Sequence, residues 1–175
     1  RVLVKKLLKR GYLVRVLTRS DKYKKVGGEE VIFGDIVQGD GLRRLVMGCD
    51  NLIHLAIYQN SRDCHREKFF ETNVLGSKRV LELAREEGVR LVMVSSAVVF
   101  EDSGNGMADE NWQKIEGDTN NWYNQTKLEQ YKLWLGSRTV IDSVLVYPTI
   151  VFDKRSQEMI EIFTSALSLC SSRIR

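Results

Sequence analysis

Apolar residues recur along the chain in two alternating spacings, one typical of strands and one typical of helices. Short runs of apolar and β-branched residues predict strands at 12–17, 31–33, 51–56, 91–94 and 140–146. Apolar residues three and four positions apart predict helices over 1–10, 40–48, 66–87, 119–135 and 157–169. Strands that are almost wholly apolar and alternate with helices are typical of a parallel sheet. We therefore predict an α/β fold with a doubly wound parallel sheet.

Polar residues stand directly after one of these strands. Ser95 and Ser96 end the strand at 91–94, although the interior of a parallel sheet has little use for adjacent hydroxyls. The longest irregular stretch, 101–118, follows them and is acidic and glycine-containing. Because open α/β sheets bind ligands at the carboxyl ends of their strands, we expect a site here. The alternative is that a serine only caps the following turn.

The composition indicates one soluble domain. At 175 residues the chain can form one buried core but not two ordinary domains. Its 27 basic and 23 acidic residues are too balanced and too dispersed to indicate a nucleic-acid groove. No apolar run is long enough to span a bilayer, and the start does not resemble a signal peptide. The three scattered cysteines argue against structural zinc and favour a reducing compartment. We expect a cytoplasmic protein without a metal, nucleic-acid or membrane partner.

Tyr123 and Lys127, in the segment WYNQTK, lie four residues apart and share one face of a predicted helix. A lysine cation beside a phenol stabilises the phenolate, which lets a tyrosine exchange a proton with a substrate oxygen near neutral pH. In a chain with six tyrosines such a pair also arises by chance. The spacing alone therefore leaves two interpretations open, a catalytic pair and an ordinary exposed pair.

Two further polar residues lie at or near strand ends. Asp35 follows the strand at 31–33, where a carboxylate either caps a turn or accepts a hydrogen bond from an exocyclic amine. His54, in NLIHLA, lies within an apolar strand. We predict that His54 is a core histidine with its hydrogen bonds satisfied, and we give it no chemical role.

These segments together resemble one family. They are similar to the extended branch of the short-chain dehydrogenases/reductases, which includes nucleotide-sugar epimerases, dihydroflavonol reductases and cinnamoyl-CoA reductases. The resemblance covers residues 1 to about 153. Its segments occur in the family's order: LVKKLLKRGYLVRVLTRS, GDI, NLIHLA, TNVLGSKRVLELARE, LVMVSSAVVF, YNQTK and VYPTIVF. Each segment is weak alone, but the ordered set is specific, and it implies a Rossmann-like sheet.

The resemblance implies roles for individual residues near the reacting atoms. Tyr123 matches the general acid/base, and Lys127 matches the residue that tunes it and binds the nicotinamide ribose. Ser96 matches the hydroxyl that polarises the substrate oxygen. Asn73 matches a helix residue near the nicotinamide side, and Pro148 a loop proline that flanks the carboxamide.

The resemblance also implies where the other half of the cofactor would bind. Asp35 and Ile36 match the pair that contacts adenine, and Leu55 and Ala56 match the strand end beside the cofactor. Arg19 follows a strand at the point where an NAD enzyme usually places a carboxylate on the ribose. An arginine there can instead bind a 2′-phosphate. We therefore expect NADP as the cofactor, with NAD less favoured.

The chain departs from the family pattern at both ends. The family begins with a strand and a glycine-rich loop that binds the pyrophosphate, and this chain starts just after that loop would end. We expect a fragment of a longer enzyme whose sheet lacks its central strand and so has two unpaired edges. Near the other end Asp153 replaces the usual glycine, and Tyr147 replaces the usual arginine. We assign 1–153 to an incomplete NAD(P)-binding domain and 154–175 to the start of a substrate-binding region.

The leading interpretation is an NADP-dependent oxidoreductase of the extended short-chain type. It would move a hydride between nicotinamide and the carbonyl or alcohol carbon of a small molecule, and the fragment by itself would be inactive. One alternative is a nucleotide-sugar epimerase or dehydratase of the same family. Another is a non-catalytic nucleotide-binding scaffold protein, which the departures at the ends favour and the intact Ser96, Tyr123 and Lys127 disfavour. A homodimer is compatible with all three.

Overall fold

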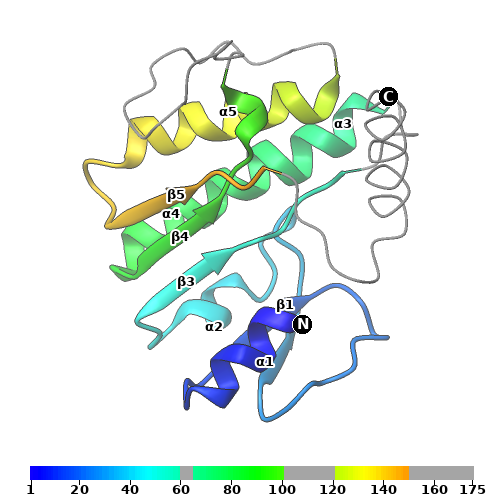
Figure 1. Ribbon diagram of the computed structural model, residues 1–175, viewed down its shortest axis with the longest axis vertical. Helices are drawn as coiled ribbons and strands as arrows, with labels where there is room; N and C mark the ends of the chain where they lie inside the picture. Colours follow the sequence, from blue (N-terminus) through cyan, green and yellow to red (C-terminus); the bar gives the residue numbers. More distant parts are fainter. Residues whose placement is uncertain (60–64, 101–120, 150–175) are drawn as a thin grey trace, which may run out of the picture.

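The computed structural model describes residues 1–59, 65–100 and 121–149, in which strands and helices alternate (Figure 1). The strands are β1 (Arg15–Thr18), β2 (Glu30–Phe33), β3 (Asn51–His54), β4 (Arg90–Val94) and β5 (Ser143–Val146). The α-helices are α1 (Val2–Lys9), α2 (Leu42–Val46), α3 (Arg66–Phe69), α4 (Ser77–Glu87) and α5 (Trp122–Ser137). A π-helical segment η1 (Phe70–Gly76) and a 3-10 turn η2 (Ala97–Val99) complete the described elements. The predicted loop at 101–118, the helix at 157–169, Asp153 and the region 154–175 lie outside the described residues.

Every pair of neighbouring strands in the described residues is parallel, which confirms the predicted α/β class. β1 pairs with β2, and β4 lies between β3 and β5. β1 and β3 are not hydrogen-bonded to each other, and within the described residues each has a strand partner on one side only. Two separate sheets agree with the expectation of a doubly wound fold without its central strand.

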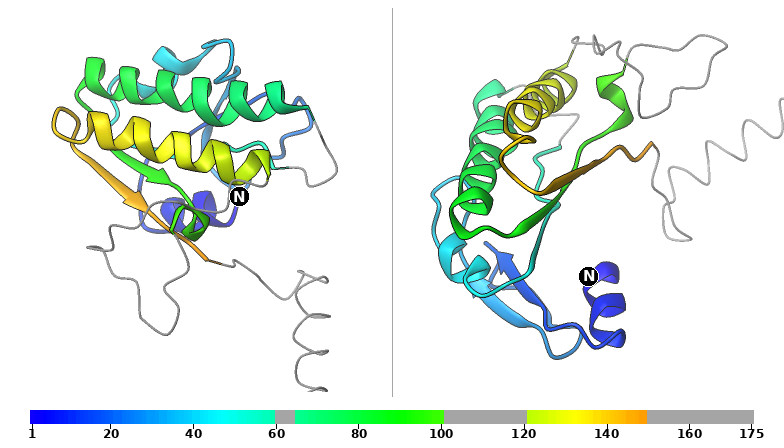
Figure 2. Two further views of the ribbon diagram at one scale, coloured as in Figure 1. Left: turned by 90° about the horizontal axis from the view of Figure 1, so that it is seen from above. Right: turned by 90° about the vertical axis from the view of Figure 1, so that its left-hand side faces the viewer.

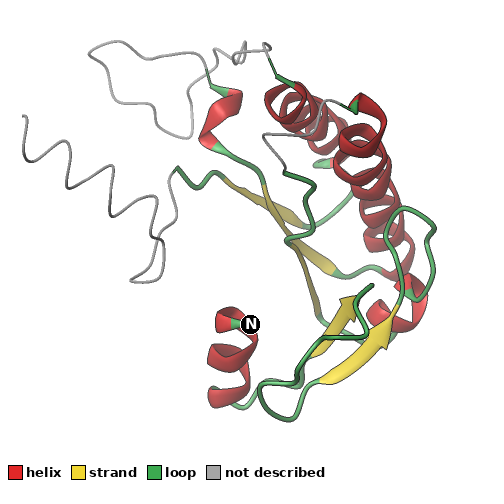
Figure 3. Cartoon of the chain, turned by 90° about the vertical axis from the view of Figure 1, so that its right-hand side faces the viewer, coloured by secondary structure: helices red, strands yellow, loops and turns green. Residues whose placement is uncertain are grey.

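The helices cover the two faces of the strands unequally. α4 and α5 lie side by side along one face of β3 to β5, whereas α1 lies on the opposite side of the strands (Figures 2 and 3). Leu91 and Met93 of β4 have no exposed surface and cluster with Val80, Leu81 and Ala84 of α4. Burying an aliphatic side chain of this size contributes roughly 1.5 to 3 kcal/mol. This core holds the α4 and α5 layer in place over β3 and β4.

The predicted helix over 66–87 is continuous but changes its winding. α3 passes into η1 and η1 into α4 without a break. A π-helix is rare and is often found at functional sites. Over the seven residues of η1 the spacing of apolar residues is the same as in an α-helix. The sequence therefore predicted one regular helix. Asn73, in the middle of η1, is completely buried.

Several elements differ from the predicted ones at their ends: β3 ends at His54 rather than at residue 56, and β5 begins at Ser143 rather than at residue 140. β1 begins at Arg15 rather than at residue 12, because the register pairs Arg15 with the first residue of β2. Leu13, which the pattern assigned to the strand, is fully exposed. α5 begins at Trp122 rather than at residue 119, because the side chain of Asn121 accepts a hydrogen bond from the Asn124 amide and caps the helix.

Two glycines fix the connections between helices and strands. Gly88 has φ 65° and ends α4 in the left-handed conformation. Gly34 follows β2, and a Cβ atom there would overlap the Asp40 carbonyl oxygen and lie 3.0 Å from Leu17 Cδ1. The chain after β2 therefore folds back tightly on itself, which holds Asp35 close to the end of the strand.

Candidate active site

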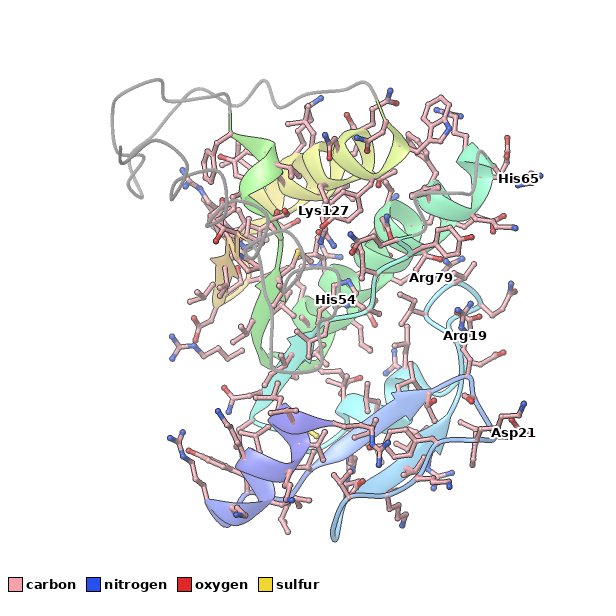
Figure 4. The ribbon with its side chains drawn as sticks, turned by 45° about the vertical axis from the view of Figure 1, so that its right-hand side comes forward. Arg19, Asp21, His54, His65, Arg79 and Lys127 are labelled. Atoms are coloured by element: carbon pink, nitrogen blue, oxygen red, sulfur yellow. The ribbon has the colours of Figure 1, made fainter. Side chains whose placement is uncertain are left out.

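The residues predicted for the site follow the carboxyl ends of the strands or lie on the neighbouring helices. Five of them follow the five strands in turn: Arg19, Asp35, Leu55, Ser96 and Pro148. Because the paired strands are parallel, these residues share one edge of each sheet. Figure 4 shows Lys127 and His54 in the interior between the helices and β3 to β5, and Arg19 near β1 and β2.

Lys127 projects from α5 into the protein interior. Its side chain is 3% exposed, and its Nζ donates hydrogen bonds to the Val94 carbonyl at 3.0 Å and to Gln130 Oε1 at 3.0 Å. Burial lowers the pKa of Lys127 from 10.5 to about 8. An ammonium has three N–H donors, so among the described residues one donor is left without a partner. The structure thus places a buried cation, held by neutral oxygens, at the end of β4.

Tyr123 and Ser96 lie on the two segments that the Lys127 side chain connects, α5 and the end of β4. Tyr123 is partly exposed and stands one turn before Lys127 on α5. Ser96 is 7% exposed, and its Oγ accepts a hydrogen bond from the Val98 amide at 3.4 Å. This is the turn cap that the sequence offered as the alternative. The cap uses an oxygen lone pair and leaves the hydroxyl hydrogen free to donate, so it is compatible with a role toward a substrate oxygen.

Both polar atoms of the Asn73 side chain form hydrogen bonds inside the protein. Its Oδ1 accepts from the Tyr58 amide at 2.7 Å, and its Nδ2 donates to the Tyr58 carbonyl and to Thr126 Oγ1, each at 3.0 Å. Both N–H donors of the carboxamide are therefore occupied. Asn73 fastens the segment after β3 to α5, immediately before Lys127.

Two buried polar residues of the site were missed by the sequence analysis. Gln130 and Ser77 have no exposed surface, and Gln130 Nε2 donates to Ser77 Oγ at 2.7 Å. Ser77 Oγ in turn lies 2.9 Å from His54 Nε2, which confirms His54 as a core histidine with a partner. Burial, and secondly the Lys127 cation, lower the pKa of His54 to about 4. The one sequence signal for Gln130 was its position three residues after Lys127, on the same helix face.

The residues after β1 and β2 form a polar turn next to the helical layer. Arg19 Nη1 lies 3.4 Å from Asp35 Oδ2, and the Arg19 side chain is 64% exposed. Asp35 Oδ1 accepts from the Val37 amide at 2.8 Å, so the carboxylate caps a turn. A long, exposed ion pair of this kind contributes little to stability and leaves the guanidinium available for another anion. Ile36 is 9% exposed and packs against Gly76 of η1, where a Cβ would lie 2.8 Å from Ile36 Cδ1.

The remaining predicted residues lie at the ends of β3 and β5. Leu55 is 53% exposed and Ala56 is also exposed, so both are accessible at the strand end. The Pro148 carbonyl accepts a hydrogen bond from the Ala97 amide at 3.0 Å, which places the proline segment beside Ser96. The end of β5 thus borders the turn that follows β4.

The described residues contain neither a candidate metal site nor a membrane-spanning helix. No group of three or more histidine, cysteine, aspartate or glutamate side chains in this part of the chain could hold a metal ion. No helix among residues 1–59, 65–100 and 121–149 is long and apolar enough to cross a membrane.

Comparison with known proteins identifies the family of this chain. Residues 1–152 match the model of the NAD dependent epimerase/dehydratase family. The chain belongs to this family. The match covers all the described strands and helices, from α1 to β5. It confirms the resemblance to the extended short-chain dehydrogenases/reductases.

Curated relatives in this family carry the names of dehydrogenases and reductases. The human sterol-4-alpha-carboxylate 3-dehydrogenase, decarboxylating, is 30% identical over 94% of this chain and 44% of its own length. Cinnamoyl-CoA reductase 2 of Medicago truncatula is 29% identical over 93% of this chain and 53% of its own. The chain therefore spans about half the length of these relatives.

Solved structures with the same fold contain NAD. The Bordetella bronchiseptica enzyme WbmH in complex with NAD+ matches with a TM-score of 0.76 at 19% identity, over 95% of this chain and 57% of WbmH. A short-chain dehydrogenase/reductase superfamily protein of Agrobacterium tumefaciens with bound NAD matches with a TM-score of 0.71 at 24% identity, over 84% of this chain and 44% of its own. At these identities the likeness establishes the Rossmann-like fold.

Proposed function

We propose that this chain is part of an NADP-dependent oxidoreductase that acts on a carbonyl or alcohol carbon of a small molecule. The observation that carries the proposal is the Lys127 ammonium, buried at the end of β4 with one N–H unused among the described residues. A buried cation without a charged partner is costly, and such groups are concentrated at functional sites. Tyr123 and Ser96, one turn away and at the same strand end, are the matching proton-transfer groups.

In this proposal Tyr123 exchanges the proton of the substrate oxygen. When a carbonyl is reduced, the phenol O–H donates its proton to that oxygen, and the phenolate is stabilised by the nearby Lys127 cation. In the reverse direction the phenolate accepts the alcohol proton. Ser96 donates its free hydroxyl hydrogen to the same oxygen and orients it. The bound nicotinamide cofactor supplies or accepts the hydride.

The residues of this chain fit a dinucleotide. The unused N–H of Lys127 suits a ribose hydroxyl, and the exposed Leu55 and Ala56 border the same strand end. Asp35 and Ile36 stand after the neighbouring strand as the proposed adenine contacts, and Pro148 flanks the turn after β4. We propose that Asn73 supports the nicotinamide side indirectly, through the segment that it fastens, because both its donors are occupied.

The preference for NADP over NAD rests on Arg19. Its guanidinium is 64% exposed and is engaged only by a long contact to Asp35 among the described residues. A guanidinium in this position offers several N–H donors to a 2′-phosphate, for which it is better suited than for a ribose diol.

The curated relatives favour a reductase or dehydrogenase over a nucleotide-sugar epimerase. Relatives at 29 to 30% identity are named as dehydrogenase and reductase. Solved structures of proteins in complex with UDP or UDP-sugars match at 21 to 23% identity, which supports the fold alone. Intact Ser96, Tyr123 and Lys127 argue against a non-catalytic scaffold protein. We propose residues 1–153 as the nucleotide-binding unit and 154–175 as the start of the substrate-binding region.

The cofactor proposal is tested by titrating the full-length protein with NADPH and with NADH. We expect tighter binding of NADPH. Because a hydrogen bond to a charged group is worth about 1.5 to 3 kcal/mol, Arg19→Ala should weaken NADPH binding about ten- to hundredfold and leave NADH binding nearly unchanged. Arg43→Ala is the matched control, since Arg43 is an equally exposed arginine that pairs with Glu86 and Glu87. Equal affinities for the two cofactors in the parent protein would refute the preference.

A further inference from the structure

A chain of buried hydrogen bonds runs from Lys127 on α5 to His54 on β3. Lys127 Nζ donates to Gln130 Oε1 at 3.0 Å, Gln130 Nε2 donates to Ser77 Oγ at 2.7 Å, and Ser77 Oγ lies 2.9 Å from His54 Nε2. Three of the four side chains are 0 to 3% exposed, and His54 is 4% exposed. Figure 4 shows its two ends, Lys127 and His54, near each other in the interior. This chain of hydrogen bonds links α5, α4 and β3.

The chemistry of these groups fixes the direction of every bond in the chain. An ammonium only donates, so the oxygen of the Gln130 amide must face Lys127 and its nitrogen must face Ser77. The Ser77 oxygen therefore accepts from Gln130, and its own hydrogen needs an acceptor. Among the described residues the only other group bonded to Ser77 Oγ is His54 Nε2. The Ser77 hydroxyl thus donates to His54, whose Nε2 must carry no proton.

We propose that Gln130 is a positioning residue, which holds the Lys127 ammonium through a one-way chain of hydrogen bonds that ends on His54. Gln130 itself touches neither substrate nor cofactor in this account. With the Val94 carbonyl it takes up two of the three N–H donors of Lys127 and leaves a single donor of fixed direction. The role of that donor toward the cofactor ribose rests on the proposed function.

The direction of the chain has a consequence that does not depend on activity. At pH 7 His54 is neutral, because burial and Lys127 keep its pKa at about 4. The one-way chain requires its proton to lie on Nδ1. Gln130→Glu reverses the direction of the hydrogen bonds at Ser77, because a carboxylate next to Lys127 accepts the Ser77 hydrogen and has no hydrogen to donate. The Ser77 oxygen must then accept from His54, so Nε2 becomes protonated.

The experiment is a long-range 1H–15N spectrum of the histidine rings in the full-length protein at pH 7, which distinguishes protonated from bare ring nitrogens. The His54 signals are assigned by their loss in His54→Gln. We expect a bare Nε2 in the parent protein, a protonated Nε2 in Gln130→Glu, and no change in Gln38→Glu, where the same substitution is made at an exposed position. A protonated Nε2 in the parent overturns the inference without any need for the variant. An unchanged Nε2 in a folded Gln130→Glu also overturns it.

A second variant tests the positioning of Lys127. Gln130→Met keeps the volume of the side chain and removes the acceptor, while the Ser77 hydroxyl still donates to His54. We expect Nε2 to stay bare and NADPH binding to weaken about ten- to hundredfold, the range for a hydrogen bond to a charged group. Unchanged NADPH affinity in this variant overturns the positioning role. If the parent protein binds no nicotinamide cofactor, the proposed function fails, while the two His54 results still decide whether the chain runs in one direction.

Discussion

Replacing Lys127 with methionine should remove a pH dependence of stability that the buried ammonium imposes on the parent protein. The pKa of Lys127 is about 8 in the folded chain and 10.5 is its ordinary value. Between these values the unfolded chain binds more protons than the folded one, so the free energy of unfolding rises with pH from about 8 to 10.5. At about 1.4 kcal/mol per pH unit, the full rise amounts to roughly 3 kcal/mol.

The difference in unfolding free energy between the parent and Lys127→Met at pH 7 is a poorer test than the change of that difference with pH. Lys127→Met relieves the full cost of burying the charge, which is roughly 3 kcal/mol. It also leaves Gln130 Oε1 and the Val94 carbonyl without the donor that they share, at about 1 to 3 kcal/mol for each buried unsatisfied group. The two effects oppose each other, so the net change at pH 7 lies between a gain of about 1 kcal/mol and a loss of about 3 kcal/mol and does not isolate the cost of burying the charge.

The assay is urea unfolding of the full-length parent and of Lys127→Met at pH 7, 8, 9 and 10. The difference in unfolding free energy, parent minus variant, should move by about 2 to 3 kcal/mol in favour of the parent as the pH rises across this range. Lys132→Met, at a lysine 58% exposed on the same helix, is the control for losing a lysine. Parallel pH curves for the parent and Lys127→Met would refute the argument that burial controls this lysine.

Two further substitutions test the buried polar groups. The parent should lose roughly 3 kcal/mol of unfolding free energy as the pH falls from 6.5 to 4, because the folded pKa of His54 is about 4 and unfolding takes up a proton there. In His54→Gln this loss should be absent. Urea unfolding across this pH range checks it, with His65→Gln, at an exposed histidine, as the control. Asn73→Ala should lower the free energy of unfolding by about 1.5 to 4.5 kcal/mol, because it removes three hydrogen bonds of about 0.5 to 1.5 kcal/mol each, two to the Tyr58 backbone and one to Thr126 Oγ1. A loss below about 1 kcal/mol in urea unfolding would show that Asn73 does not fasten this segment.

The strands, helices and parallel pairing were predictable because their pattern of apolar residues is local. Alternation of apolar strands with helices identified the α/β class. The start of β1 was not predictable, since Tyr12 and Leu13 are as apolar as strand residues and only the register with β2 excludes them. The π-helical winding of η1 was not predictable either, because its apolar spacing is that of an α-helix.

The site was predictable only in part, because a polar residue's partners depend on packing. Lys127 and Tyr123 share a helix face, which their spacing of four indicated, and His54 was expected to have a buried partner. Gln130 and Ser77 are polar residues in helices, and such residues usually face solvent. Their burial follows from how α4 and α5 lie against each other, which no local pattern in the sequence records.

The central claim is that Tyr123 transfers the proton that accompanies hydride transfer. It is tested most directly by NADPH-dependent turnover with a panel of aldehydes and ketones, measured together with NADPH affinity, for the full-length parent and Tyr123→Phe. General acid/base assistance is typically worth about a hundred- to ten-thousand-fold. We predict that Tyr123→Phe loses turnover within that range while NADPH affinity changes little. A Tyr123→Phe protein that turns over substrate at close to the parental rate would contradict the proposed mechanism.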